Sequence, residues 1–185
     1  MPTVNRRTLL YALGGIAVFP SVASPEVGSR GVAISNAGES RFRYKDSQQA
    51  RLSPCKLTSE DTDGRLSTFE LIVPSRSGPV RHVHHREDEW CYVAGGQFSF
   101  EVGNSKHELP VGASIWMPRD IPHVWANTAS AEGKLLVACQ PGGFEKFFDE
   151  IAQVPAADAA QIKAVMARYG MEYLGPPLLG PWRRK

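Results

Sequence analysis

The chain has 185 residues, of which 42% are hydrophobic and 22% charged, which is enough to bury one ordinary core. Lys and Arg number 21 against 19 for Asp and Glu, and the two signs are interspersed. This balance argues against a nucleic-acid partner, which would need a basic patch. The three cysteines, Cys55, Cys91 and Cys139, are too few and too widely spaced for a disulfide scaffold or a CxxC metal knuckle. From its length and hydrophobic content, the chain is expected to form one main domain.

Residues 1–23 have the order of a signal peptide. Arg6-Arg7 precedes an apolar stretch over residues 8–19, and the small residue Ala23 suits a cleavage site. Paired arginines followed by Thr-Leu-Leu are typical of a twin-arginine signal. The alternative, a buried helix, is disfavoured by two glycines and a proline. The sequence thus predicts an exported protein, periplasmic or secreted, with no stable membrane span, because the apolar run is too short to cross a bilayer.

Residues 24–35 show no periodic pattern of hydrophobic residues and are expected to form a flexible segment that leads into the domain. From residue 36 to 141, short β-rich segments alternate with turns rich in Gly, Pro, Asn and Asp. Repeated short strands with regular turn signals are typical of an antiparallel sandwich or barrel. The six expected strands cover 65–73, 89–94, 97–102, 113–117, 123–127 and 134–139.

Residues 142–185 predict helices followed by a tail. The segment 142–153 repeats apolar residues on one helical face, and 155–169 predicts a second helix that ends at Gly170. Both helices are expected to pack on the barrel, whereas the Gly- and Pro-rich stretch from Leu174 cannot continue a helix. The apolar face of the first helix consists of Phe144, Phe147, Phe148 and Ile151.

Histidines gather in two short segments, one containing His82 and His84 and the other ending in His123. In an extended strand, residues two apart point to the same face, so His82 and His84 can converge on one ion. A turn after His84 would bring Glu89 into the same space. Three imidazoles and one carboxylate suit Fe, Mn, Ni, Co, Cu or Zn and leave positions open for water or substrate. The alternatives are a solvated loop and hydrogen-bonded core histidines.

The spacing of these residues resembles the two sequence motifs of the cupin family, over roughly residues 66–141. The first gap, from Gly78 to His82, is shorter than the family's usual spacing, and Asp120 replaces the usual Gly of the second motif. Asp tolerates a left-handed backbone, so this replacement bears only on turn geometry. The first motif comprises Gly78, His82, His84, Glu89 and Gly96. The second comprises Gly112, Pro118, Asp120, His123 and Asn127.

The resemblance implies a mainly β fold, the cupin double-stranded β-helix or jelly-roll barrel. Together with the strand and helix patterns, this predicts a barrel over residues 36–141, with C-terminal helices and a tail in 142–185. It also implies that His82, His84, Glu89 and His123 hold one divalent transition metal inside the barrel. A small-molecule partner and a homodimer formed through sheet edges are further expectations.

Strict alternation places apolar side chains beside the expected metal. Cys91 follows Glu89 by two residues and Trp125 follows His123 by two, so both should face inward. An aromatic pocket without an inward Arg suits an aromatic substrate better than a small dianion. The alternative for these side chains is plain core packing. The predicted substrate pocket consists of Phe69, Cys91, Phe98, Phe100 and Trp125.

Single-domain cupins with this pattern, including a stretch like that at 141–148, resemble quercetin 2,3-dioxygenase. In that reading the metal binds a deprotonated substrate hydroxyl beside O2, and Glu89 is the catalytic residue that takes the proton as general base. Cupins also include decarboxylases, lyases, isomerases and proteins that only bind small molecules, and these stay open as alternatives.

Overall fold

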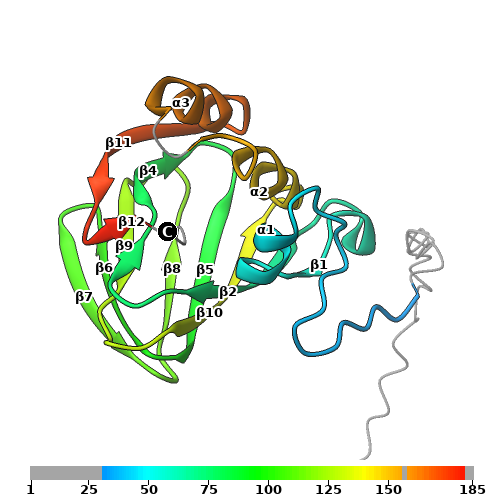
Figure 1. The fold of residues 1–185 in the computed structure, drawn as a ribbon, viewed down its shortest axis with the longest axis horizontal. Coiled ribbons are helices and arrows are strands. Elements are labelled where there is room, and N and C mark those ends of the chain that lie inside the picture. The colour runs from blue at the N-terminus through cyan, green and yellow to red at the C-terminus, as the bar shows by residue number, and fades with distance from the viewer. Residues whose placement is uncertain (1–30, 156–157, 182–185) are drawn as a thin grey trace, which may run out of the picture.

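The computed structural model describes residues 31–155 and 158–181. The predicted signal peptide, residues 1–23, and most of the predicted lead lie outside these residues. Two five-stranded antiparallel sheets build the body of the described protein, with α2 and α3 at one end (Figure 1). Buried side chains from both sheets join in one hydrophobic cluster, so the sheets share a core.

The strand order shows how distant segments meet. The first sheet runs β1 (Cys55–Leu57), β2 (Ser67–Val73), β10 (Gly133–Gln140), β5 (Asp88–Gly95) and β8 (Ser114–Met117). The second runs β11 (Met171–Pro177), β4 (Val80–His84), β9 (His123–Asn127), β6 (Gln97–Val102) and β7 (Ser105–Pro110). A short parallel pair joins β3 (Ser77–Gly78) to β12 (Gly180–Pro181). The helices are α1 (Ser47–Leu52), the 3-10 turn η1 (Glu60–Thr62), α2 (Glu145–Ile151) and α3 (Ala159–Arg168).

All six predicted strands are present, with ends shifted by at most two residues. Their inward faces follow the alternation of the sequence: in β2 and β10, every second residue is buried. Alternation of this kind fixes the register, because a slip of one residue would turn the apolar face to water.

The strand β11 in the C-terminal segment was not predicted from the sequence. Residues 171–177 form β11, which pairs with β4 at the edge of the second sheet. Two prolines and a glycine hid this strand, since they are unfavourable inside a sheet. An edge strand tolerates proline because one row of its N–H groups has no partner, and irregular register at Tyr173, Gly175 and Pro177 accommodates the sequence. The C-terminal segment therefore contributes to the barrel as well as covering it.

A buried carboxylate fastens α2 to the barrel. Glu145 accepts hydrogen bonds from the Ser59 backbone N–H at 3.0 Å and the Ser59 hydroxyl at 2.6 Å, and from the Ser67 hydroxyl on β2. Burial alone would raise the pKa of Glu145, but these hydrogen bonds outweigh it and hold the pKa below its ordinary value of 4.5. The anchor fixes the helix on the first sheet.

Replacing Glu145 by Gln should destabilise the protein by about 2 kcal/mol at neutral pH, because hydrogen bonds to an ionised acceptor are lost. Because the folded-state pKa lies below the ordinary value, the carboxylate stabilises fully above about pH 4.5 and progressively less as the pH falls. The difference between wild type and Glu145→Gln in urea-unfolding free energy should therefore shrink below this pH. A difference that stays constant down to pH 3 would contradict the role of the ionised form.

Gly78 lies where the chain passes over β9. A Cβ atom at this position would stand 2.0 Å from the backbone oxygen of Trp125, and neither group belongs to a flexible side chain. Close approach of two backbones therefore requires glycine here.

Gly78→Ala should lower the free energy of unfolding by about 2 kcal/mol or more, since the clash can be relieved only by moving the backbone. Gly95→Ala is the matched control, because its Cβ would meet only Lys134 at an ordinary 3.6 Å. Chemical denaturation of both variants checks the prediction, and equal losses would count against it.

Candidate metal centre

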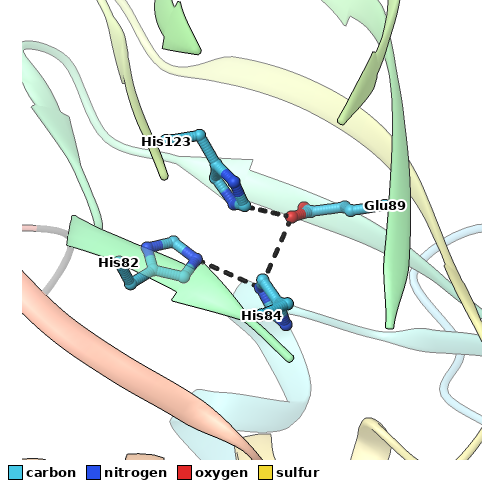
Figure 2. Close-up of side chains that lie close together, drawn as sticks. All are labelled: His82, His84, Glu89 and His123. Carbon is cyan, nitrogen blue, oxygen red and sulfur yellow. Dashed lines mark hydrogen bonds and ion pairs between the residues drawn. The ribbon is translucent and has the colours of Figure 1, made fainter. Parts of the chain in front are cut away.

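Four side chains from three strands converge in the barrel interior. His82 and His84 come from β4, Glu89 from β5, and His123 from the first position of β9, directly opposite His82 in register. One ligand atom from each lies within 4.8 Å of the others, and all four residues are buried. Figure 2 shows the three rings and the carboxylate turned toward one another. The residues predicted as a set are thus brought together.

Backbone carbonyls orient two of the rings. Nδ1 of His82 lies 2.7 Å from the carbonyl oxygen of Val80, and Nδ1 of His123 lies 3.0 Å from that of Ile121. A carbonyl oxygen only accepts hydrogen bonds, so each Nδ1 carries the proton and each Nε2 presents a lone pair to the cluster. This is the form in which neutral histidine binds a metal.

The nitrogen atoms facing the cluster lack ordinary partners. Nε2 of His123 is buried and makes no hydrogen bond, although Oε2 of Glu89 stands 3.3 Å away. Nε2 of His82 and Nε2 of His84 are 3.1 Å apart, a distance at which two lone pairs repel unless a proton or cation lies between them. Buried polar atoms are normally satisfied. The donor set therefore fits a transition-metal ion, which would satisfy all four residues at once.

The protonation states also suit metal binding. Burial and the neighbouring imidazoles of His123 and His84 lower the pKa of His82 well below 6.5, so its ring is neutral. Burial alone would raise the pKa of Glu89, but its contacts with the surrounding imidazoles, that of His123 above all, bring it down to about 2. A neutral imidazole and an ionised carboxylate are the ligand forms of both residues.

The turn before His123 contains Asp120, which stands where the second motif usually has Gly. Asp120 has a φ of 64°, in the left-handed region, and its backbone N–H donates to the carbonyl of His84 at 2.7 Å. The expectation that Asp would tolerate this backbone is confirmed. Its carboxylate also hydrogen-bonds His85, which points away from the cluster.

A cavity of about 610 Å³ opens onto His82, His84 and Glu89. Its wall comes from both sheets and from the C-terminal helices, and Phe144 at the start of α2 packs on the His84 ring at a centroid distance of 5.1 Å. Aromatic and aliphatic side chains dominate this wall: Leu52, Leu71, Val80, Trp125, Val137, Phe144, Phe147, Phe148, Ile151, Ile162, Met166, Met171 and Tyr173.

Of the five residues predicted to line the pocket, Trp125 does so. Phe69, Cys91, Phe98 and Phe100 face inward as expected but lie in the packed core instead. Phe98 and Phe100 pack against Trp125, and Phe69 packs against Phe148, so these rings support the wall from behind. These four residues do not line this cavity, because alternation predicts which residues face inward but not which part of the inner face stays open.

The sequence reading missed the helical part of the wall. The apolar face of α2 was recognised from its spacing but was assigned to packing alone, whereas Phe144, Phe147, Phe148 and Ile151 also line the cavity. Tyr173 was missed because β11 was not predicted. All three cysteines are buried free thiols, and Cys91 donates to Oε1 of Glu89 at 3.5 Å.

Comparison with known proteins finds a family match for the middle of the chain. Residues 68–139 match the family described as cupin domain. This part of the chain is therefore similar to a cupin domain. The matched segment includes all three strands that carry the four clustered residues, so the buried His and Glu group able to bind a metal lies within it.

Two curated relatives match parts of the chain. Protein SchB of Streptomyces halstedii is 29% identical over 87 residues, which are 46% of this chain and 63% of that protein. Uncharacterized protein MJ1618 of Methanocaldococcus jannaschii is 31% identical over 77 residues, 42% of this chain and 62% of that protein. The chain thus spans less than two thirds of the length of either relative.

Solved structures that match part of this chain include KdgF from a Halomonas species, at 18% identity and a TM-score of 0.46, covering 51% of this chain and 82% of that one. A sugar phosphate isomerase of the cupin superfamily from Silicibacter pomeroyi is 16% identical with a TM-score of 0.42, covering 55% and 67%. Among the described residues, no helix is both long and apolar enough to cross a membrane.

Replacing His123 by Ala should reduce metal affinity by more than the roughly 10- to 100-fold lost when a residue that merely hydrogen-bonds a ligand is removed. His85→Ala is the matched control, because His85 adjoins His84 but binds Asp120 and has a side chain 48% exposed. Elemental analysis and chelator competition on both purified variants provide the measurement. Equal metal content in the two variants would count against the centre.

Proposed function

We propose that this cupin domain is a metal-dependent oxygenase, similar to quercetin 2,3-dioxygenase, acting on an aromatic or enolisable small molecule. The observation that carries the proposal is the position of the four-residue cluster, which opens into a cavity with five aromatic side chains in its wall. A pocket of this size and composition suits a flat, largely apolar molecule that carries few polar groups.

The charge of the wall favours a neutral substrate. Among the described residues that line the cavity, none is Lys or Arg, and the acidic or amide side chains are Asp46, Gln48 and the cluster's own Glu89. A sugar phosphate or a small dicarboxylate would require a cationic partner for its charge. A phenol or enol requires none, since it enters neutral and needs a single acceptor for its proton.

Each residue of the cluster has a role in this chemistry. His82, His84 and His123 would hold the ion, with Nε2 of each ring facing it. The metal would supply the Lewis acidity that lowers the pKa of a substrate hydroxyl, and the redox chemistry with O2. Glu89 is ionised at neutral pH, so its carboxylate can accept the hydroxyl proton. The thiol of Cys91 holds Oε1 of Glu89, while Oε2 faces the imidazoles.

Oxygen uptake tests this function directly. The purified protein, loaded separately with Fe, Mn, Ni, Co or Cu, should consume O2 with members of a panel of flavonols and dihydroxyaromatics, and not with sugar phosphates or sugar acids. Turnover without O2 uptake would instead identify a lyase, decarboxylase or isomerase. Tight ligand retention without any product would identify a binding protein.

Glu89→Gln should abolish turnover while part of the metal is retained, because the amide keeps a ligand oxygen but cannot accept the proton. Glu70→Gln is the control, since Glu70 pairs with Lys134 outside the cluster, at 2.6 Å. Steady-state O2 uptake and metal content are measured on the same samples. Full activity in Glu89→Gln would remove this residue from the role of base.

A further inference from the structure

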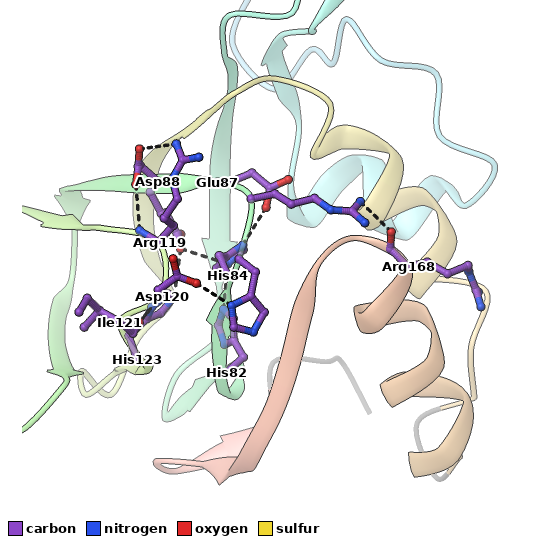
Figure 3. Close-up of polar contacts among 12 residues, drawn as sticks. His82, His84, Glu87, Asp88, Arg119, Asp120, Ile121, His123 and Arg168 are labelled. Atoms are coloured by element: carbon purple, nitrogen blue, oxygen red, sulfur yellow. Dashed lines mark hydrogen bonds and ion pairs between the residues drawn. The ribbon is translucent and has the colours of Figure 1, made fainter.

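Another buried carboxylate, besides Glu89 and Glu145, stands behind the four-residue cluster. Glu87 lies in the turn between β4 and β5, and its side chain is 11% exposed. Its Oε2 atom is 3.4 Å from Nδ1 of His84, on the side of the ring opposite the cluster (Figure 3). We propose that Glu87 is a positioning residue, which holds the proton of His84 on Nδ1 and so turns the Nε2 lone pair toward the metal.

The turn that carries Glu87 is held on both sides. The guanidinium of Arg86 donates to the backbone oxygen of Arg168 at the end of α3, at 2.9 Å. Asp88 accepts from the backbone N–H of Arg119 at 2.9 Å and from its guanidinium at 2.7 Å. Both neighbours of Glu87 are thus tied to other elements, which fixes the backbone of the turn from which its side chain reaches His84.

The Nδ1 atom of His84 depends on a side-chain partner, whereas the Nδ1 atoms of His82 and His123 do not. His82 and His123 have their Nδ1 protons fixed by backbone carbonyls, which any sequence would supply. For His84 the acceptor is a side chain, so the orientation of this ligand depends on one residue of the sequence. Carboxylates that bind the remote nitrogen of a metal-bound histidine fix its tautomer and strengthen it as a ligand.

The 3.1 Å contact between His82 and His84 shows what Glu87 prevents. If the His84 proton were on Nε2, it would donate to the Nε2 lone pair of His82 and close the pair to a metal. Nδ1 of His84 would then be an acceptor facing the acceptor oxygens of Glu87, which is unfavourable in a buried site. The carboxylate therefore selects the tautomer that leaves both Nε2 atoms free for the ion.

Three variants separate this role from a general effect on folding. Glu87→Leu keeps the approximate size of the side chain and removes the acceptor, whereas Glu87→Gln keeps an oxygen acceptor without the charge. Glu172→Leu is the matched control, because Glu172 faces the imidazole of a histidine outside the cluster, His85, at 3.7 Å. All variants are made in the full chain.

The first measurement requires no metal. Long-range proton–nitrogen NMR of the metal-free protein, with His84 assigned by substitution, reports which ring nitrogen carries the proton. We expect Nδ1–H in the wild type, Glu87→Gln and Glu172→Leu, and a shift of the proton to Nε2 in Glu87→Leu. If Nδ1 of His84 carries no proton in the wild type, the proposal is overturned before any variant is measured.

The second measurement is the affinity for Zn²⁺ alone, by competition with a chelator. We expect a loss of about 10- to 100-fold in Glu87→Leu, most of which Glu87→Gln restores, and no change in Glu172→Leu. Unchanged affinity and tautomer in Glu87→Leu would overturn the role of Glu87. If the wild type binds no metal, the proposed function fails, while the NMR result still decides whether Glu87 sets the tautomer.

Discussion

The burial of three imidazoles and a carboxylate in one small volume is the constraint around which the structure is arranged. Placing four polar groups in a barrel interior is unfavourable unless each finds a partner. The outer nitrogens of the histidines have partners on the protein: two carbonyls and the Glu87 carboxylate. The ring nitrogens and carboxylate oxygen that face the cluster have only one another as neighbours. The pKa values of His82 and Glu89 are lowered, so the imidazole is neutral and the carboxylate is ionised, which are the forms that bind a cation. The centre is thus preorganised for an ion.

The surrounding barrel gives this group its geometry. Alternation along β4 puts two histidines on one face, and the pairing of β4 with β9 sets a third opposite the first. The pairing of β5 with β10 buries Glu89 beside Cys139 on the inner face of the other sheet. Because the ligands come from strands and not from loops, their separation is fixed by the register of the two sheets.

Much of this arrangement could be predicted from the sequence. Spacing and alternation predicted the four clustered residues, the six strands and the resemblance to cupins, since these depend on local periodicity and on short motifs. Sequence could not identify β11, whose prolines contradict strand propensity and are tolerated only because the strand lies at a sheet edge. It could not separate open from filled parts of the inner face, which is why Phe98 and Phe100 were placed in the pocket instead of behind Trp125. The export signal in residues 1–23 stays a prediction.

The clustered residues and much of the cavity wall come from different segments of the chain, and this separation has an evolutionary consequence. The segment 68–139 supplies all four residues of the cluster, whereas much of the cavity wall comes from residues 144–177, beyond the family match. Mutations in the later stretch can reshape what the pocket admits without disturbing the residues that would do the chemistry. Kinship within the matched segment is therefore a better guide to a shared ion than to a shared substrate, and a graft of the C-terminal stretch between relatives would be the natural way to exchange specificities.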